Sequence, residues 1–137
     1  MKSGRSEGGG EGNVGMVKTK GLTHIHLLVK DLGRSLRFYK SVFGMEEKYR
    51  IGKDMVFLST PGSSDLITLH EDPAKPELLG KSGGIEHFGF QLAEDVNLDK
   101  AIHEVERAGG KLLSRGDHGG KHPYAYVSDP DGYAIEL

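Results

Sequence analysis

The stretch that decides the fold is Leu22–Gly44, LTHIHLLVKDLGRSLRFYKSVFG. Its first residues alternate in character, and because strand side chains alternate between two faces, one face is apolar while the other carries His24 and His26. Asp31 then stands where a helix N-cap belongs, apolar residues follow at helical spacing, and Gly44 suits the left-handed position after a helix. The stretch predicts a strand and a helix that covers its apolar face, which leaves both imidazoles facing another partner.

Composition excludes several classes of function. The chain has 137 residues, a net charge of -2 and no cysteine. The near-neutral charge gives no general attraction to nucleic acid or to an anionic membrane, and no apolar run approaches the roughly 20 residues that span a bilayer. Without cysteine, a metal ion must be bound by His, Asp or Glu. We therefore expect a cytoplasmic protein with a small-molecule substrate and no nucleic-acid or membrane partner.

The chain divides into a tail and one domain. Residues 1–15 are rich in glycine and nearly free of apolar side chains, which predicts a flexible tail or an expression remnant. Residues 16–137 form the single domain, with a first module over about 21–71, a linker at 72–84 and a second module over 85–137. After the opening strand and helix, the first module continues with three expected strands, Glu46–Arg50, Met55–Ser59 and Leu66–Glu71.

The second module repeats the plan of the first. Its expected elements are a strand, a helix and three more strands, in this order: Ile85–Leu92, Val96–Ala108, Lys111–Ser114, Tyr124–Ser128 and Tyr133–Leu137. Two such βαβββ modules indicate an internal duplication, and each is too small to bury its sheet face alone. The sequence thus predicts an α+β fold in which both modules form a curved, mostly antiparallel, eight-stranded sheet, with the helices outside and an open cup inside.

Side-chain alternation places a set of polar residues on the inner face of this sheet. The set comes from strands of both modules and consists of His24, His26, Thr68, His70, His87, Ala134 and Glu136. Two imidazoles and one carboxylate on converging strands can hold a divalent metal and leave coordination positions open for water or substrate. Each histidine can instead be an isolated polar residue with a structural partner.

Three segments carry a resemblance to a known family. They are HIHLLVKDLGRSLRFYKSVFG from His24, EHFGFQL around His87, and DPDGYAIEL around Glu136. Over nearly all of Gly21–Leu137 the sequence resembles the vicinal oxygen chelate superfamily, which includes glyoxalase I, extradiol dioxygenases, fosfomycin-resistance enzymes and metal-free bleomycin-binding proteins. The resemblance implies one divalent ion (Fe, Mn, Zn, Ni or Co) bound by His24, His87 and Glu136. It also implies a homodimer, and in many members the first module of one chain completes the site with the second module of its partner.

The sequence also departs from the family pattern. Four-ligand glyoxalases carry a second Glu where this chain most closely aligns Thr68, which argues against an octahedral glyoxalase site. His26 and His70 are the candidate catalytic residues, because a neutral imidazole beside a metal-bound substrate can accept a proton. Either can instead orient a ligand or fill the wall of the cup. His118 and His122 lie in a glycine-rich loop and are interpreted as lid residues.

The resemblance favours an enzyme. We expect a divalent-metal-dependent member of this superfamily that acts on a small substrate chelating the metal through adjacent oxygens, either as a glyoxalase-like lyase or isomerase or as a dioxygenase-like ring cleaver. The alternatives are a binding protein of the bleomycin-resistance type, which sequesters a small molecule, and a fosfomycin-modifying resistance enzyme.

Overall fold

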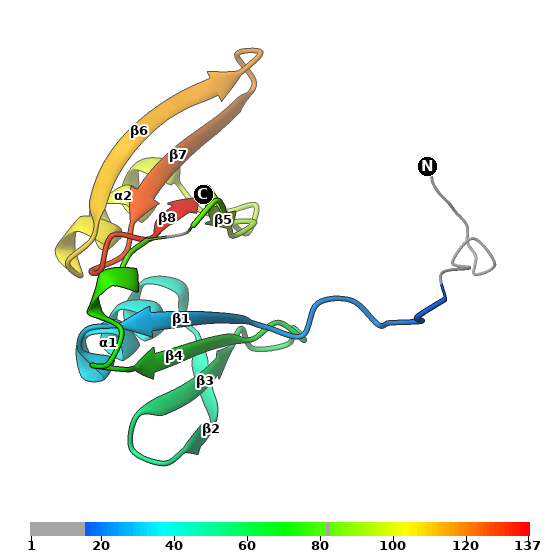
Figure 1. Cartoon of the computed structure of the whole chain (residues 1–137). Helices are drawn as coiled ribbons and strands as arrows, with labels where there is room; N and C mark the ends of the chain where they lie inside the picture. The colour runs from blue at the N-terminus through cyan, green and yellow to red at the C-terminus, as the bar shows by residue number, and fades with distance from the viewer. Residues whose placement is uncertain (1–15, 82) are drawn as a thin grey trace.

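The computed structural model describes residues 16–81 and 83–137, and the predicted tail at residues 1–15 lies outside them. Each half of the chain forms a βαβββ module, as the sequence predicts (Figure 1). The first module contains β1 (Ile25–Val29), α1 (Leu32–Phe43), β2 (Glu46–Ile51), β3 (Met55–Ser59) and β4 (Ile67–Glu71). The second contains β5 (Phe88–Gly89), α2 (Leu98–Arg107), β6 (Lys111–His118), β7 (His122–Ser128) and β8 (Ala134–Glu136), after the short 3-10 helix η2 (Pro76–Leu78) in the linker.

The strands form two four-stranded sheets of the same topology. Their orders are β1-β4-β3-β2 and β5-β8-β7-β6, and in each sheet the first pair is parallel while the other pairs are antiparallel. The two-module fold is therefore confirmed, with the eight strands divided between two hydrogen-bonded sheets. Figure 1 shows the sheets one above the other, with both helices on the same side. We call the face of each sheet that lies opposite its helix the inner face.

Local sequence sets the ends of α1. The Asp31 side chain accepts a hydrogen bond from the backbone N–H of Arg34, which satisfies one of the free donors of the first turn. Gly44 ends the helix with φ 66°, a conformation that costs glycine little because it has no Cβ. In α2, Asn97 takes the corresponding N-cap position and accepts from Lys100. The caps of α1 lie at the positions predicted from the sequence.

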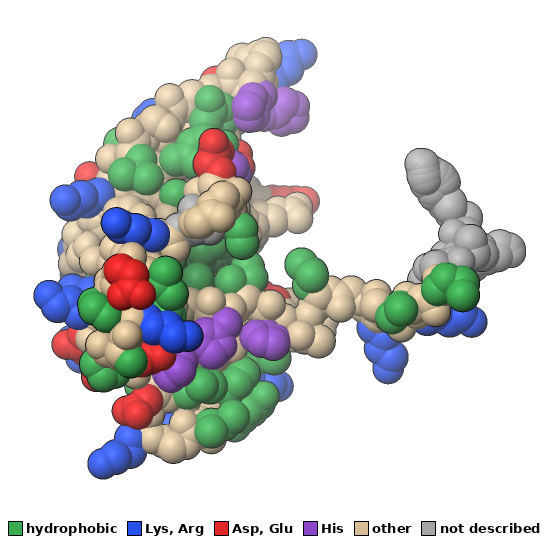
Figure 2. All heavy atoms as spheres, viewed as in Figure 1, with side chains coloured by type: hydrophobic (Ala, Val, Ile, Leu, Met, Phe, Trp, Pro, Cys, Tyr) green, Lys and Arg blue, Asp and Glu red, His purple; other side chains and the backbone are tan. Residues whose placement is uncertain are grey.

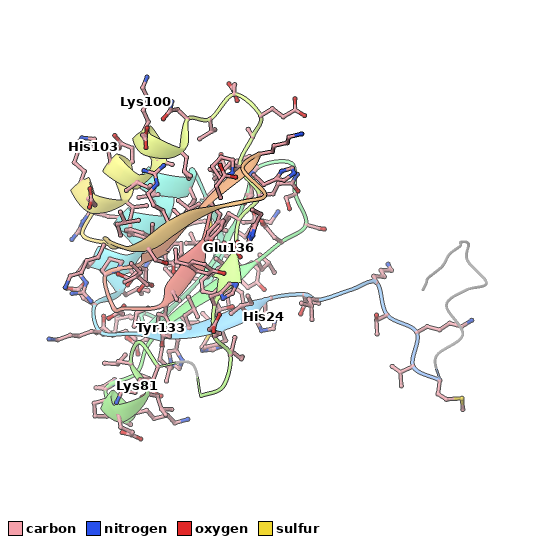
Figure 3. The ribbon with its side chains drawn as sticks, turned by 90° about the horizontal axis from the view of Figure 1, so that it is seen from above. His24, Lys81, Lys100, His103, Tyr133 and Glu136 are labelled. Atoms are coloured by element: carbon pink, nitrogen blue, oxygen red, sulfur yellow. The ribbon has the colours of Figure 1, made fainter. Side chains whose placement is uncertain are left out.

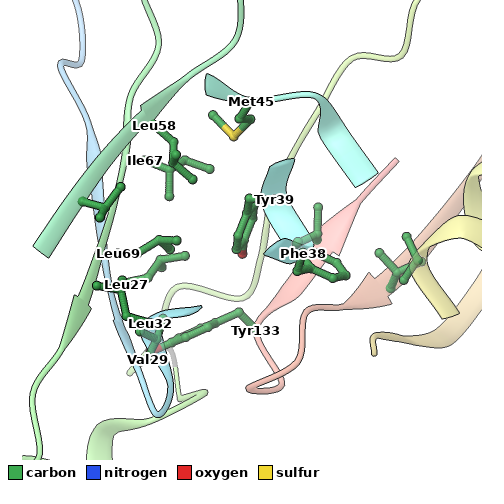
Figure 4. Close-up of a cluster of buried hydrophobic side chains, with 14 of the residues drawn as sticks. Leu27, Val29, Leu32, Phe38, Tyr39, Met45, Leu58, Ile67, Leu69 and Tyr133 are labelled. Atoms are coloured by element: carbon green, nitrogen blue, oxygen red, sulfur yellow. The ribbon is translucent and has the colours of Figure 1, made fainter. Parts of the chain in front are cut away.

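One apolar core joins the two modules (Figure 4). Phe38 and Tyr39 of α1 are 1% and 0% exposed, and the core continues into Val127 and Ile135 of the second module. Burying a side chain of this size contributes roughly 1.5–3 kcal/mol, so the helix face supplies a large share of the stability. The exposed members of the inner faces lie outside this core.

A polar contact also holds α1 against the second module. The Tyr39 hydroxyl donates to Asp129 at 2.8 Å, and Asp129 is itself only 2% exposed. The other oxygen of Asp129 accepts from the backbone N–H groups of residues 131, 132 and 133, which closes the turn between β7 and β8. Burial raises the pKa of Asp129, and the Tyr39 hydrogen bond acts in the opposite direction. The turn at residues 129–132 therefore also connects α1 of the first module to the second module.

Strand lengths differ from the sequence-based expectation in the second module. β5 spans only Phe88–Gly89, whereas the alternating pattern predicts a strand over 85–92. β6 and β7 are longer than predicted and extend to His118 and His122, because Gly119 and Gly120 both have positive φ and close a three-residue loop between them. The interpretation of these two histidines as loop residues is wrong, since they are paired across the end of the hairpin.

Candidate functional site

The inner faces carry the polar residues that alternation predicts, distributed over both modules. His26 pairs with Thr68 across β1 and β4, and Leu28 pairs with His70. The opposite face of the same strands carries Leu27, Val29 and Leu69 in the core. Figure 2 shows the molecule hollowed on the side away from the helices, with histidine side chains from both halves along the hollow.

His87 and Glu136 form a close pair in the second module. The Nε2 atom of His87 lies 3.2 Å from the Oε1 atom of Glu136, and the two side chains are 26% and 31% exposed. Strand pairing explains this approach, because β5 and β8 run parallel and place Gly89 opposite Glu136. A Cβ at Gly89 would lie 3.1 Å from the carbonyl oxygen of Glu136, so glycine allows the two strands to approach closely.

A second carboxylate, from the exposed Glu86, contacts His87. Its Nδ1 atom lies 2.9 Å from the Oε1 atom of Glu86. If Nδ1 carries the proton and donates to Glu86, then Nε2 presents a lone pair to the oxygen of Glu136, and two acceptors face each other. A divalent cation shared by Nε2 and the Glu136 carboxylate removes this repulsion, and histidine ligands commonly donate their other N–H to a carboxylate. This pair therefore fits a metal ion by its donor chemistry.

His24 is placed in the first module. It is exposed, and its Nδ1 atom lies 2.8 Å from the hydroxyl of Thr23, which leaves Nε2 free. Within residues 16–81 and 83–137, no group of three or more His, Asp or Glu side chains is gathered closely enough to hold a metal. The chain thus brings His87 and Glu136 together and does not add His24 to them; Figure 3 labels His24 and Glu136 on their separate modules.

His26 and His70 are in direct contact. The Nε2 atom of His26 lies 3.0 Å from the Nδ1 atom of His70, and the two rings meet edge to face. Burial lowers the pKa of His26, and the neighbouring imidazoles of His70 and His24 lower it further. The pair lies on the inner face of the first module, beside a fully buried Thr68. Its catalytic role stays a prediction.

Thr68 cannot act as an accessible ligand in this arrangement. Its side chain is 0% exposed, and its hydroxyl oxygen has no hydrogen-bond partner among the described residues. Position 68, where four-ligand glyoxalases carry a second Glu, therefore has no charge and is not accessible to a metal ion. Exclusion of Thr68 leaves His24, His87 and Glu136 as the ligands that the resemblance implies.

A cavity of about 630 Å³ lies between the modules, beside the predicted residues. Its wall includes His26 from β1, His87 and Glu86 from the segment before β5, and Lys81 from the linker. A second cavity, of about 740 Å³, is lined mainly by apolar residues around Phe43, Phe88 and Phe90, and it includes none of the predicted ligands. The smaller cavity is therefore the one connected with the candidate chemistry.

Sequence reasoning missed the aromatic residues of the inner faces and the partner of His87. Tyr126 lies on β7 opposite Glu136, with its ring centroid 4.8 Å from that of His87. Removal from water raises the pKa of Tyr126, and the carboxylates of Glu136 and Glu86 raise it further. Alternation along β7 already places Tyr124 and Tyr126 on one face, so the signal was present. The contact of Glu86 with His87 has no such signal, because adjacent residues usually point to opposite faces.

Comparison with known proteins identifies the family. The family model described as Glyoxalase/Bleomycin resistance protein/Dioxygenase superfamily matches residues 21–137. The chain belongs to this superfamily. The resemblance found in the sequence is therefore confirmed, and the superfamily fold agrees with the two modules and their sheets.

The chain covers different shares of its individual relatives. Catechol-2,3-dioxygenase of Bacillus subtilis (strain 168) is 32% identical over 119 residues, which is 84% of this chain but 41% of that protein. Lactoylglutathione lyase of Escherichia coli O157:H7 is 32% identical over 127 residues, covering 85% of this chain and 90% of the relative. The chain thus spans less than half of the dioxygenase and nearly all of the lyase.

A solved structure shows the same fold. It is a variant of the fosfomycin resistance protein FosX from Listeria monocytogenes, complexed with Mn(II) and 1S,2S-dihydroxypropylphosphonic acid. The FosX variant is 25% identical to this protein; the match covers 88% of this chain and 90% of the FosX chain, with a TM-score of 0.69.

Neither α1 nor α2, nor any other helix in residues 16–81 and 83–137, has the length and apolar character needed to span a membrane.

Proposed function

We propose that this protein is a metal-dependent enzyme of the superfamily, acting on a small substrate that binds one divalent ion through two adjacent oxygens. The observation that carries the proposal is the pairing of His87 with Glu136 at 3.2 Å on the inner face, with Glu86 orienting the imidazole. His24 is the third ligand in this proposal. A bound divalent ion supplies Lewis-acid polarisation of the substrate oxygens.

We further propose that the site is shared by two copies of the chain. His24 and the His87–Glu136 pair lie in different modules, and no described group of three donors forms within one chain. A symmetric homodimer repeats every contact twice, so it provides two equivalent sites, each with His24 from one copy and the pair from the other. A cytoplasmic location stays a prediction from the sequence.

His26 and His70 are the proposed proton-handling residues. Because one of the two facing nitrogens must donate and the other accept, the pair holds a proton between Nε2 of His26 and Nδ1 of His70. His26 lies in β1, two residues after His24, which precedes the strand. Two residues of extended chain span about 6.5–7 Å, which is within reach of a substrate bound at a metal on His24. The His70 ring orients the His26 ring.

Two reaction types fit this site. A ring-cleaving dioxygenase is supported by the burial of Thr68, which stands where four-ligand glyoxalases carry a second Glu and so leaves three proposed ligands. A lyase or isomerase of the glyoxalase type is supported by the similarity to a lactoylglutathione lyase over nearly the whole of that relative. Fosfomycin modification and simple sequestration of a small molecule are the remaining alternatives.

Elemental analysis combined with an activity panel tests the proposal. Protein purified without chelator should contain nearly one divalent ion per chain, His87→Ala should contain little, and His103→Ala, altered at an exposed position of α2, should match the wild type. The panel contains catechols with oxygen, the adduct of methylglyoxal with a thiol, and fosfomycin. Equal metal in wild type and His87→Ala contradicts the ligand assignment, and metal-independent ligand binding without turnover indicates a sequestering protein.

A further inference from the structure

The segment before β1 carries apolar side chains that the described residues of the chain leave uncovered. We call this segment, residues 16–22, the arm. Its Met16, Val17 and Leu22 are 99%, 80% and 93% exposed, and Figure 1 shows the arm in blue, running away from both modules. Isolated apolar residues are common on protein surfaces, but three in so short a segment leave a large apolar area in water. A partner that covered them would gain stability from their burial.

Glycine gives the arm freedom to change direction. Gly21 has φ 110°, and a Cβ at this position would meet no atom within 4 Å. Its backbone N–H donates to the Thr19 hydroxyl at 3.3 Å, a contact within the arm. Pairing with the first sheet begins at Ile25, whose backbone N–H donates to the carbonyl oxygen of Leu66 at 3.2 Å. The arm can therefore turn at Gly21 without disturbing β1.

An apolar groove lies beside the point where the arm joins the sheet. It is the cavity of about 740 Å³, which extends to Ile25, the first residue of β1. Phe43 of α1 and Phe90 form part of its wall and stack with their ring centroids 4.1 Å apart and 12° between the rings. Ile25 and Val96 are 39% and 44% exposed, so apolar surface reaches the edge of the groove. Pockets of roughly 300–1,000 Å³ hold drug-sized ligands, and the groove is therefore large enough for several apolar side chains.

The charges around the apolar groove complement those of the arm. The arm contains Lys18 and Lys20 and no acidic residue. Acidic side chains predominate around the groove: Asp65 and Glu104 line it, and Glu94 and Asp95 lie in the segment between two lining residues, Ala93 and Val96. Lys100, which also lines the groove, and Arg107, which pairs with Glu104, reduce this excess without cancelling it. The groove therefore attracts a basic apolar segment.

The position of the arm favours exchange between two copies of the chain. Ile25 lines the groove and follows Leu22 by three residues, so the arm starts at the rim of the groove. Figure 1 shows the arm leaving in the direction away from the modules, so it would have to reverse to enter the groove of its own chain. In a dimer with a two-fold axis close to this rim, each arm instead reaches the groove of the other copy, and the contact is made twice.

We propose that the arm of one copy binds in the apolar groove of a second copy, with its apolar side chains against the wall formed by Phe43 and Phe90 and its two lysines at the acidic rim. The inference goes beyond the proposed function, because none of the proposed metal ligands lines this groove. The contact should therefore form with or without metal.

Disulfide cross-linking between two single-cysteine variants tests the exchange. The natural sequence contains no cysteine, so the introduced thiols are the only ones present. Val17→Cys places a thiol in the arm, and Ala93→Cys places one on a residue that lines the groove, with a purification tag on one of the two chains to identify the mixed product. After mixing and mild oxidation, the mixed disulfide should form at least about tenfold faster than in a control pair, because docking raises the effective concentration of one thiol at the other.

Control variants separate docking from random collision. The control pair is Val17→Cys with Lys53→Cys, an exposed position in the turn between β2 and β3, at the end of β3 opposite to the groove. Thr60→Cys, at a second lining residue, keeps the test available if Ala93→Cys fails to fold. Adding Lys18→Glu and Lys20→Glu to the arm should lower the rate relative to the control pair roughly two- to tenfold at low salt, the effect of losing two exposed ion pairs.

The outcomes distinguish this inference from the proposed function. Equal rates for the groove pair and the control pair overturn the inference. If separate single-cysteine chains do not cross-link but a chain with both Val17→Cys and Ala93→Cys forms a disulfide within itself, the arm occupies its own groove and exchange is again overturned. Fast cross-linking of the groove pair that persists in EDTA supports the exchange, and it does so even if metal analysis contradicts the assignment of His87 as a ligand.

Discussion

At the scale of single residues, His87 has the most constrained environment of the proposed ligands. Its two ring nitrogens face Glu86 and Glu136 at 2.9 and 3.2 Å. Strand alternation predicts His87 and Glu136 on the inner face, and the resemblance over EHFGFQL and DPDGYAIEL implies that they are ligands. The sequence does not predict that Glu86 contacts His87. Both residues precede β5, which begins at Phe88, and outside a strand neighbouring side chains need not point to opposite faces.

Removing the negative charge of Glu86 should weaken metal binding without unfolding the protein. Glu86→Gln replaces the carboxylate that orients Nδ1 of His87, and changes of this kind commonly cost about ten- to hundredfold in metal affinity. Competition titration with a chromophoric chelator measures the effect. Glu94→Gln, at an exposed position away from the pair, is the control. Equal affinity of both variants and the wild type would show that Glu86 does not orient the ligand.

His26 gives a second prediction at this scale. His26→Ala should keep its metal and its fold but lose roughly 10²–10⁴-fold in turnover, the usual contribution of a general acid or base. Metal content and steady-state rates on the active member of the panel provide the measurement. Loss of metal would make His26 a ligand, and unchanged turnover would make it part of the wall. His70→Ala should lower turnover less, because that ring acts through His26.

At the scale of elements, α1 contacts the second module through the buried Tyr39–Asp129 hydrogen bond and through Arg34 and Ser35, which both donate to Asp131. The sequence predicts the helix, its cap at Asp31 and its end at Gly44, because capping and periodicity are local signals. It does not predict that Tyr39 reaches Asp129, since that contact joins residues far apart in the chain. Local patterns thus define the elements here, and tertiary contacts define how they are joined.

Tyr39→Phe should therefore destabilise the protein. The change removes the donor to a carboxylate that is 2% exposed, and a buried acceptor left without its donor costs about 1–3 kcal/mol. Urea denaturation followed by circular dichroism measures the free energy of unfolding. Tyr49→Phe makes the same chemical change on a half-exposed side chain and should stay within about 0.5 kcal/mol of the wild type. Equal stabilities of the two variants would contradict the structural role of the Tyr39 hydroxyl.

At the scale of the whole molecule, two similar modules each hold part of the candidate site. The sequence predicts the duplication from repeated patterning, and the structure confirms two βαβββ units with the same strand order. Patterning carries no information on whether His24 meets His87 and Glu136 within one chain or between two, because each module places its residues on its own inner face. The described chain keeps the donors apart, which favours the shared arrangement.

Mixing two inactive variants tests the shared site most directly. His24→Ala and His87→Ala chains each lack one proposed ligand in every site, so neither homodimer should retain metal after dialysis. When the two are unfolded and refolded together, a mixed dimer has one site with all three ligands and one with neither histidine. Random pairing of equal amounts should then restore metal to about a quarter of the sites. A mixture that binds no more metal than the separate variants would contradict a site shared between two chains.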